Sequence, residues 1–142
     1  MGIIGVVAQI GRATMEDQVQ VAAIDPKTVK ELQVLAPTEE VLSTVVEAFQ
    51  SLADPTRFKI LHALMTHEVC VRDLAILIGV SESAISHQLR FLRDRHLVGQ
   101  RREGNIIYYT LSDHHLPELM REAESHAEHV TRGEHQHHLK IS

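Results

Sequence analysis

The stretch CVRDLAILIGVSESAISHQLRFLRDRHLVGQRREGNIIYYTL, residues 70–111, restricts the fold of this chain more than any other feature. Its first part predicts a short helix over Val71–Ile78 from the spacing of its apolar residues. Gly79 can adopt the left-handed backbone conformation that ends such a helix. The small Ala75 lies where a second helix could cross closely.

The second part of this stretch predicts another helix and then a β-hairpin. Ser81 or Ser83 is a suitable N-cap, and the helix runs to about His96. Its expected buried positions are Ala84, Ile85, Leu89 and Leu92. Two β-rich runs, LVGQRR and NIIYYTL, then flank the turn sequence EGN. A helix-turn-helix followed by a hairpin predicts a mainly α fold with a β-hairpin wing, the winged helix-turn-helix.

Helices are also expected on both sides of this stretch. Upstream, one amphipathic helix begins near Glu39, and Asp54 and Pro55 are suited to start the next. A short helix is expected near Lys27–Leu35, and the last helix runs from about His115 to Arg132. Three regions follow from this division: a weakly ordered arm over 1–36, a DNA-binding and dimerisation domain over 37–132, and a His-rich tail over 133–142.

Composition limits the class of protein. One cysteine among 142 residues rules out a disulfide framework within the chain, which fits a reducing, cytoplasmic environment. No apolar run approaches the roughly 20 residues that span a membrane, so no membrane partner is expected. The initial MGIIGVVAQIG has no basic n-region, so we do not expect a signal peptide.

The second helix of the helix-turn-helix carries side chains that read DNA. Gln pairs with adenine, Arg with guanine or phosphate, and Ser with either. Five arginines and three acidic residues lie between Ser81 and Gly104, whereas acidic residues outnumber basic ones after Leu111. We therefore expect double-stranded DNA at this positive region, rather than a protein partner. The expected contacts are Ser83, Ser86, His87, Gln88 and Arg90, with Arg101 and Arg102 on the wing.

Seven of the eleven histidines lie between Leu111 and His138. Asp113 and His115 stand at the start of the last helix, and His126 and His129 share one face near its end. Carboxylate and imidazole are good zinc ligands. The two pairs cannot hold one ion in one chain, because 13 helical residues span about 20 Å.

A two-fold homodimer removes this difficulty. If two copies of the last helix pack antiparallel, Asp113 and His115 of one chain meet His126 and His129 of the other, at two identical inter-subunit sites. His114 is expected to point away from the site. The tail histidines His135, His137 and His138 either complete a larger coordination sphere or belong to a plain tail.

Four segments, LADPTRFKIL, EVCVRDLA, GVSESAISHQLRFLRDRHLV and YYTLSDHHL, resemble the ArsR/SmtB family of metal-responsive repressors. The resemblance covers roughly Glu39 to Arg132. It implies a dimeric repressor of metal-efflux or sequestration genes that leaves its operator when metal binds. The family's zinc-type site on the last helix falls on the same four residues. The family's other metal site uses a pair of thiols, and this chain matches it only with Cys70, because position 72 is Arg72 rather than cysteine. This mismatch argues against sensing of arsenite, cadmium or lead.

The identity of the sensed metal depends on how many ligands the site provides. Four nitrogen and oxygen ligands suit tetrahedral Zn2+, whereas Ni2+ or Co2+ would need further ligands from the tail. A zinc hydrolase is disfavoured, because HAEH lacks the H-E-x-x-H spacing and no nucleophile motif is present. A metal store with a winged-helix scaffold is the other alternative, and sequence-specific DNA binding would exclude it. We therefore expect no enzyme.

Overall fold

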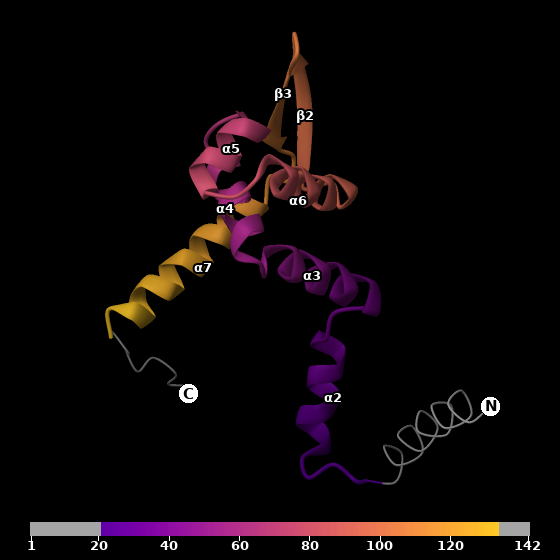
Figure 1. The fold of residues 1–142 in the computed structure, drawn as a ribbon. Coiled ribbons are helices and arrows are strands. Elements are labelled where there is room, and N and C mark those ends of the chain that lie inside the picture. The colour runs from indigo at the N-terminus through magenta and orange to yellow at the C-terminus, as the bar shows by residue number, and fades with distance from the viewer. Residues whose placement is uncertain (1–20, 134–142) are drawn as a thin grey trace, which may run out of the picture. The chain divides into compact units, whose positions relative to one another are not determined.

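A computed structural model of the chain describes residues 21–133. Its elements are, in chain order, α2 (Pro26–Leu35), α3 (Glu39–Leu52), α4 (Pro55–Leu64), β1 (Val69–Cys70), α5 (Val71–Ile78), α6 (Glu82–Asp94), β2 (Val98–Glu103), β3 (Ile106–Leu111) and α7 (Leu116–Thr131). Figure 1 labels all of them except β1. The chain divides into two compact units, with the boundary between Thr44 and Val45, so that α3 contributes to both.

The first unit, as far as it is described, contains α2 and the first residues of α3. The expected short helix is present as α2, which begins one residue before the predicted start. Asp25 caps it by accepting hydrogen bonds from the Thr28 hydroxyl at 2.6 Å and the Thr28 backbone N–H at 3.0 Å. These hydrogen bonds to Thr28 lower the pKa of Asp25 below its ordinary value.

The second unit has a core of aliphatic side chains gathered from α4, α5, α6 and α7. Residues that are fully buried include Ile60 and Leu61 of α4, Leu74 of α5, and Ile85 of α6. Among the described residues, Ser51 is the one buried polar residue, and its hydroxyl donates a hydrogen bond to the Glu47 carbonyl at 2.9 Å. The low aromatic content therefore produces a core of branched aliphatic residues.

The helix-turn-helix is formed by α5 and α6, as expected. Gly79 ends α5 with φ of +80°, and its N–H donates to the Ala75 carbonyl at 2.8 Å. Ser81 rather than Ser83 caps α6, by accepting from the Ala84 N–H at 3.0 Å. The expectation that Ala84 is buried is wrong: it is exposed, because it lies about 100° around the helix from the stripe formed by Ile85, Leu89 and Leu92.

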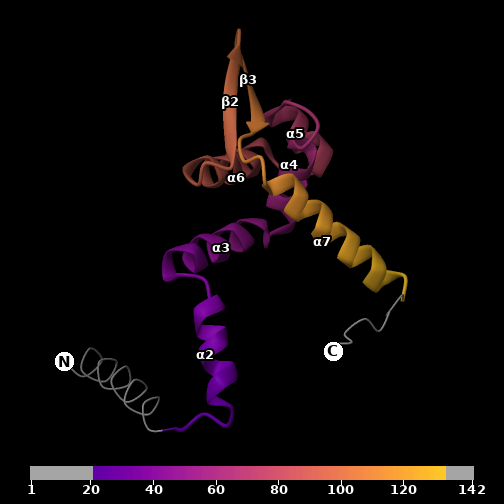
Figure 2. The same cartoon turned by 180° about the vertical axis from the view of Figure 1, so that it is seen from behind.

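The wing is an antiparallel hairpin of β2 and β3 (Figure 2). Its register pairs Arg101 with Tyr108 and Arg102 with Ile107. The two-residue strand β1, which the sequence did not predict, adds to the other edge of β3 and gives the order β1-β3-β2. The prediction of a mainly α fold with a β-hairpin wing is confirmed. No helix within residues 21–133 is long and apolar enough to cross a membrane.

The last helix, α7, extends over 16 residues after the wing. Leu116 and Met120 are buried, and Glu124 continues the same stripe one turn later. The Glu124 carboxylate lies 3.0 Å from Nε2 of His62, which ties this stripe to α4. The C-terminal half of α7 is otherwise exposed.

Candidate nucleic-acid interface and metal-ligand helix

The exposed face of α6 carries four of the five residues that were predicted to read DNA from this helix. They are Ser83, Ser86, His87 and Arg90. At 3.6 residues per turn, these positions occupy one sector of the helix, roughly opposite the buried stripe. Hydroxyl, imidazole and guanidinium groups are therefore presented together on one surface, which can form hydrogen bonds with base edges and phosphates.

The fifth residue, Gln88, was expected to be exposed like the others, but it is half-buried at the edge of the buried stripe. Its side-chain oxygen accepts a hydrogen bond from Nη1 of Arg57 at 3.4 Å. Arg57 belongs to the first turn of α4, 31 positions earlier in the chain. One predicted DNA contact is therefore already engaged by a residue of another helix.

The Arg57 side chain also binds the end of α3. Its Nε donates to the Ser51 carbonyl at 2.9 Å and its Nη2 donates to the Gln50 carbonyl at 2.9 Å. The last carbonyl groups of a helix lack partners within the helix and carry partial negative charge, so a cation is favoured there. The planar guanidinium thus joins three elements: α3, α4 and α6.

The ring of Phe91 on α6 makes cation–π contacts with two guanidinium groups. The Arg57 guanidinium carbon is 4.3 Å from the ring centroid, and that of Arg95 is 3.5 Å from it. Arg95 also donates to the Phe91 carbonyl at 3.2 Å and lies 3.5 Å from the Glu47 carboxylate. These cation–π contacts hold both guanidinium groups against α6, the predicted recognition helix. Sequence periodicity did not indicate this cluster, because long side chains at distant positions form it.

The two wing arginines differ in their surroundings. Arg101 is held by two carboxylates, with Nη2 at 2.7 Å from Glu68 and Nη1 at 2.9 Å from Glu103. Hydrogen bonds to Glu68 and then Glu103 raise the pKa of Arg101 above its usual range, so its charge is permanent but locally neutralised. Among the described residues, Arg102 donates only to the Gly104 carbonyl, at 3.1 Å. Its charge is the more available of the two for a phosphate group.

The N-terminal end of α7 is organised by Asp113. Oδ1 of this side chain accepts from the His115 N–H at 2.8 Å and from the Leu116 N–H at 3.2 Å, and so caps the helix. Both of these hydrogen bonds go to the same carboxylate oxygen, Oδ1. The His115 side chain, one residue before the helix, is exposed, as is that of His114.

Near the other end of α7, His126 and His129 are exposed. Their positions lie off the stripe of Leu116, Met120 and Glu124, with His129 roughly opposite it. Their imidazoles therefore face away from the core. Asp113 lies just before α7, and His115 and His126 are 11 positions apart, about 16 Å at the rise of 1.5 Å per helical residue. Within residues 21–133 of a single chain, no three His, Cys, Asp or Glu side chains converge as a metal site would need.

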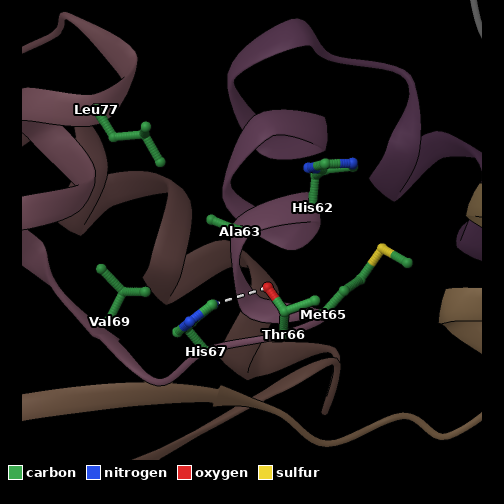
Figure 3. Close-up of a pocket in the computed structure, with 7 residues that line it drawn as sticks. All are labelled: His62, Ala63, Met65, Thr66, His67, Val69 and Leu77. Atoms are coloured by element: carbon green, nitrogen blue, oxygen red, sulfur yellow. Dashed lines mark hydrogen bonds between the residues drawn. The ribbon is translucent and has the colours of Figure 1, made fainter.

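The remaining histidines occupy other surroundings. His62 is paired with Glu124, and His67 hydrogen-bonds the Thr66 hydroxyl at 2.8 Å. Figure 3 shows both beside a mostly apolar hollow between α4 and α5, where the two imidazoles do not converge. Cys70 is half-buried. The tail residues His135, His137 and His138 lie outside the described residues.

The comparisons with known proteins agree on one family. The family model for "Bacterial regulatory protein, arsR family" matches residues 54–99, which include α4, α5 and α6. A transcriptional repressor SmtB homolog of Synechocystis is 50% identical over 58% of this chain and 62% of its own length. The match thus spans less than two thirds of that relative.

Two further proteins extend the comparison. A cadmium resistance transcriptional regulatory protein CadC homolog of Staphylococcus aureus is 38% identical over 61% of this chain and 72% of its own length. A solved structure, the homodimeric winged helix-turn-helix DNA-binding domain of a Mycobacterium bovis protein, superimposes with a TM-score of 0.61 at 26% identity. That comparison covers 72% of this chain and 98% of the other.

Proposed function

Because the chain belongs to the ArsR family of bacterial transcriptional regulators, we propose that it is a metal-responsive repressor that binds operator DNA as a homodimer. In this proposal Zn2+ releases the operator and derepresses genes for metal efflux or sequestration. Proteins of this family regulate transcription and are not enzymes. The names of the relatives, a repressor and a cadmium resistance regulator, support a response to metal.

The distribution of ligands along α7 carries the proposal. A carboxylate and an imidazole lie just before the helix, and two imidazoles lie near its other end, with His115 and His126 about 16 Å apart along the helix axis. All three imidazoles are exposed, and the hydrogen bonds that Asp113 accepts within residues 21–133 go to Oδ1, which leaves Oδ2 for a metal ion. Such an arrangement suits a site whose ligands come from two chains. We assign Asp113 and His115 of one chain and His126 and His129 of the other to each site.

A homodimer is supported by a separate observation on α3. Large apolar side chains of this helix remain exposed in the single chain, at 43% or more of their full accessible area: Val41, Leu42, Val45, Val46 and Phe49. A contiguous apolar stripe of this kind marks a surface that another protein covers. The M. bovis homolog is homodimeric, which favours a second copy as that protein.

Metal and DNA are coupled in this proposal through the dimer geometry. Zn2+ bound between the two last helices would fix the angle between the chains. The two recognition helices would then leave the spacing of about 34–36 Å that adjacent half-sites require. To lower the fraction of dimers in the DNA-binding conformation from 99% to 1%, the metal must bind the released conformation roughly 10⁴-fold more tightly.

Nickel or cobalt is the second candidate effector. Either ion would require more ligands than the four on α7, and the tail sequence EHQHH contains three further histidines. In this alternative, His135, His137 or His138 completes the coordination sphere of the metal ion. Removal of the tail separates the two candidates.

The test uses a DNA duplex selected by the intact protein from a random library. Fluorescence anisotropy at fixed salt measures its affinity with Zn2+, Ni2+, Co2+ or no metal, for the intact chain and for a chain ending at Arg132. Release by Zn2+ from both proteins is the expected result. Release by Ni2+ or Co2+ that is lost on truncation would support the second candidate. A duplex that no metal releases would refute a metal-responsive repressor.

A further inference from the structure

The contacts of Arg57 point to a role in DNA recognition beyond the surface residues of α6. Its guanidinium is fixed on three sides: by the Gln50 and Ser51 carbonyls at the end of α3, and by the ring of Phe91. Nη1 faces the Gln88 side chain. The group that meets Gln88 therefore has a fixed position and a fixed orientation.

The chemistry of the guanidinium decides which way the Gln88 amide turns. Arginine has five N–H donors and no acceptor, so only the amide oxygen can face it favourably. The oxygen and the NH2 group of an amide lie on opposite sides of the same carbon. With Oε1 held at 3.4 Å from Nη1, the NH2 group is directed away from Arg57.

We propose that Arg57 is a positioning residue for DNA recognition, which orients the Gln88 amide so that its NH2 group is presented to the operator. Gln88 then acts as a hydrogen-bond donor. The bases that offer an acceptor in the major groove are guanine through O6 and N7, thymine through O4, and adenine through N7. This proposal rests on the proposed DNA-binding function and adds a specificity determinant that lies outside the helix-turn-helix.

The orientation would also connect base recognition to α3. Arg57 holds the Gln50 and Ser51 carbonyls and the Gln88 oxygen with one rigid group, so α3 and the amide are fixed to each other. Lysine could keep the charge, but its ammonium lacks the planar fork that makes several contacts in fixed directions. Arg57→Lys is therefore the substitution that removes positioning and retains charge.

The experiment measures binding of the selected duplex and of a set in which each base pair under α6 is replaced in turn. Gln88→Ala first identifies the base pair that Gln88 reads. We expect Arg57→Lys to lower discrimination at that same base pair by about fivefold or more. In the double variant Arg57→Lys/Gln88→Ala, discrimination should fall no further than in Gln88→Ala alone.

Arg95→Lys is the matched control, because Arg95 also stacks on Phe91 but, within the part of the chain that the structure describes, donates no hydrogen bond to Gln88. It should weaken binding to every duplex by a similar factor and leave discrimination unchanged. The proposal is overturned if Arg57→Lys behaves in the same way. It is also overturned if Gln88→Ala alters discrimination at no base pair. Absence of any sequence preference in the intact protein would instead refute the proposed function.

A second variant tests the orientation with Arg57 in place. In Gln88→Glu, one carboxylate oxygen would face Arg57 and the other would replace the NH2 group, so the donor is lost. We expect discrimination at the base pair read by Gln88 to fall as it does in Gln88→Ala. If the amide oxygen faced the DNA instead, the glutamate would keep that acceptor and the preference would persist. Thermal unfolding of each variant checks that it is folded.

Discussion

At the scale of single residues, Asp113 has two tasks that one pair of substitutions can separate. Its Oδ1 caps α7 through the His115 and Leu116 N–H groups, and its other oxygen is the proposed metal ligand. Asparagine keeps an oxygen for the cap but loses the charge that attracts a cation. Alanine loses both.

We therefore expect Asp113→Asn to weaken Zn2+ binding at least tenfold and to change the free energy of unfolding by less than about 0.5 kcal/mol. Asp113→Ala should weaken Zn2+ binding similarly and also lower the free energy of unfolding by about 1 kcal/mol. Competition with a chromogenic chelator measures the first quantity, and urea unfolding without metal measures the second. Unchanged Zn2+ affinity in Asp113→Asn would remove this residue from the site.

The wing arginines give a second prediction at this scale. Each phosphate contact that is lost reduces the slope of log K against log salt by about 0.9. Arg102→Ala should show this reduction. Arg101→Ala should change the slope by about half as much or less, because Glu68 and Glu103 already neutralise that guanidinium. Equal changes in the two variants would mean that Arg101 exchanges its carboxylate partners for phosphate on binding.

At the scale of elements, the turn between α5 and α6 depends on one backbone conformation. Gly79 has φ of +80°, and a Cβ added there would meet no atom within 4 Å. Gly79→Ala should therefore cost about 1 kcal/mol of stability from backbone strain alone. Urea unfolding measures this cost, with the exposed helical substitution Ser86→Ala as the control that should change stability little. A neutral Gly79→Ala would show that the turn relaxes without loss.

The elements also show how far sequence reasoning extends. Periodicity and capping residues predicted α5, α6, the hairpin and α7 closely, because those signals are local. The prediction that Ala84 is buried was wrong, because a small apolar residue beside a buried stripe is tolerated both in the core and at the surface. The strand β1 was missed, because two residues carry no periodicity and depend on pairing with β3. The contacts of Arg57 depend on tertiary structure, although Arg57 itself lies in the family-like segment LADPTRFKIL.

At the scale of the whole molecule, the exposed apolar face of α3 predicts where two chains meet. Phe49 is 54% exposed in the single chain. If it is buried between two copies, Phe49→Ser should raise the dimer dissociation constant at least tenfold, since each copy loses an apolar contact. Sedimentation equilibrium measures this constant. Ile76→Ser on α5 is the control, because Ile76 is 75% exposed and lies on the helix-turn-helix. Equal effects of the two substitutions would contradict this interface.

The most direct measurement of the central claim is zinc stoichiometry in a mixed dimer. One partner carries Asp113→Ala/His115→Ala and the other carries His126→Ala/His129→Ala. Sites shared between chains require one complete site in the mixed dimer and none in either homodimer. We expect one tightly bound Zn2+ per mixed dimer, with weak binding to both parents, by calorimetric titration. Tight binding to either parent, or none to the mixture, would contradict a site built from two chains.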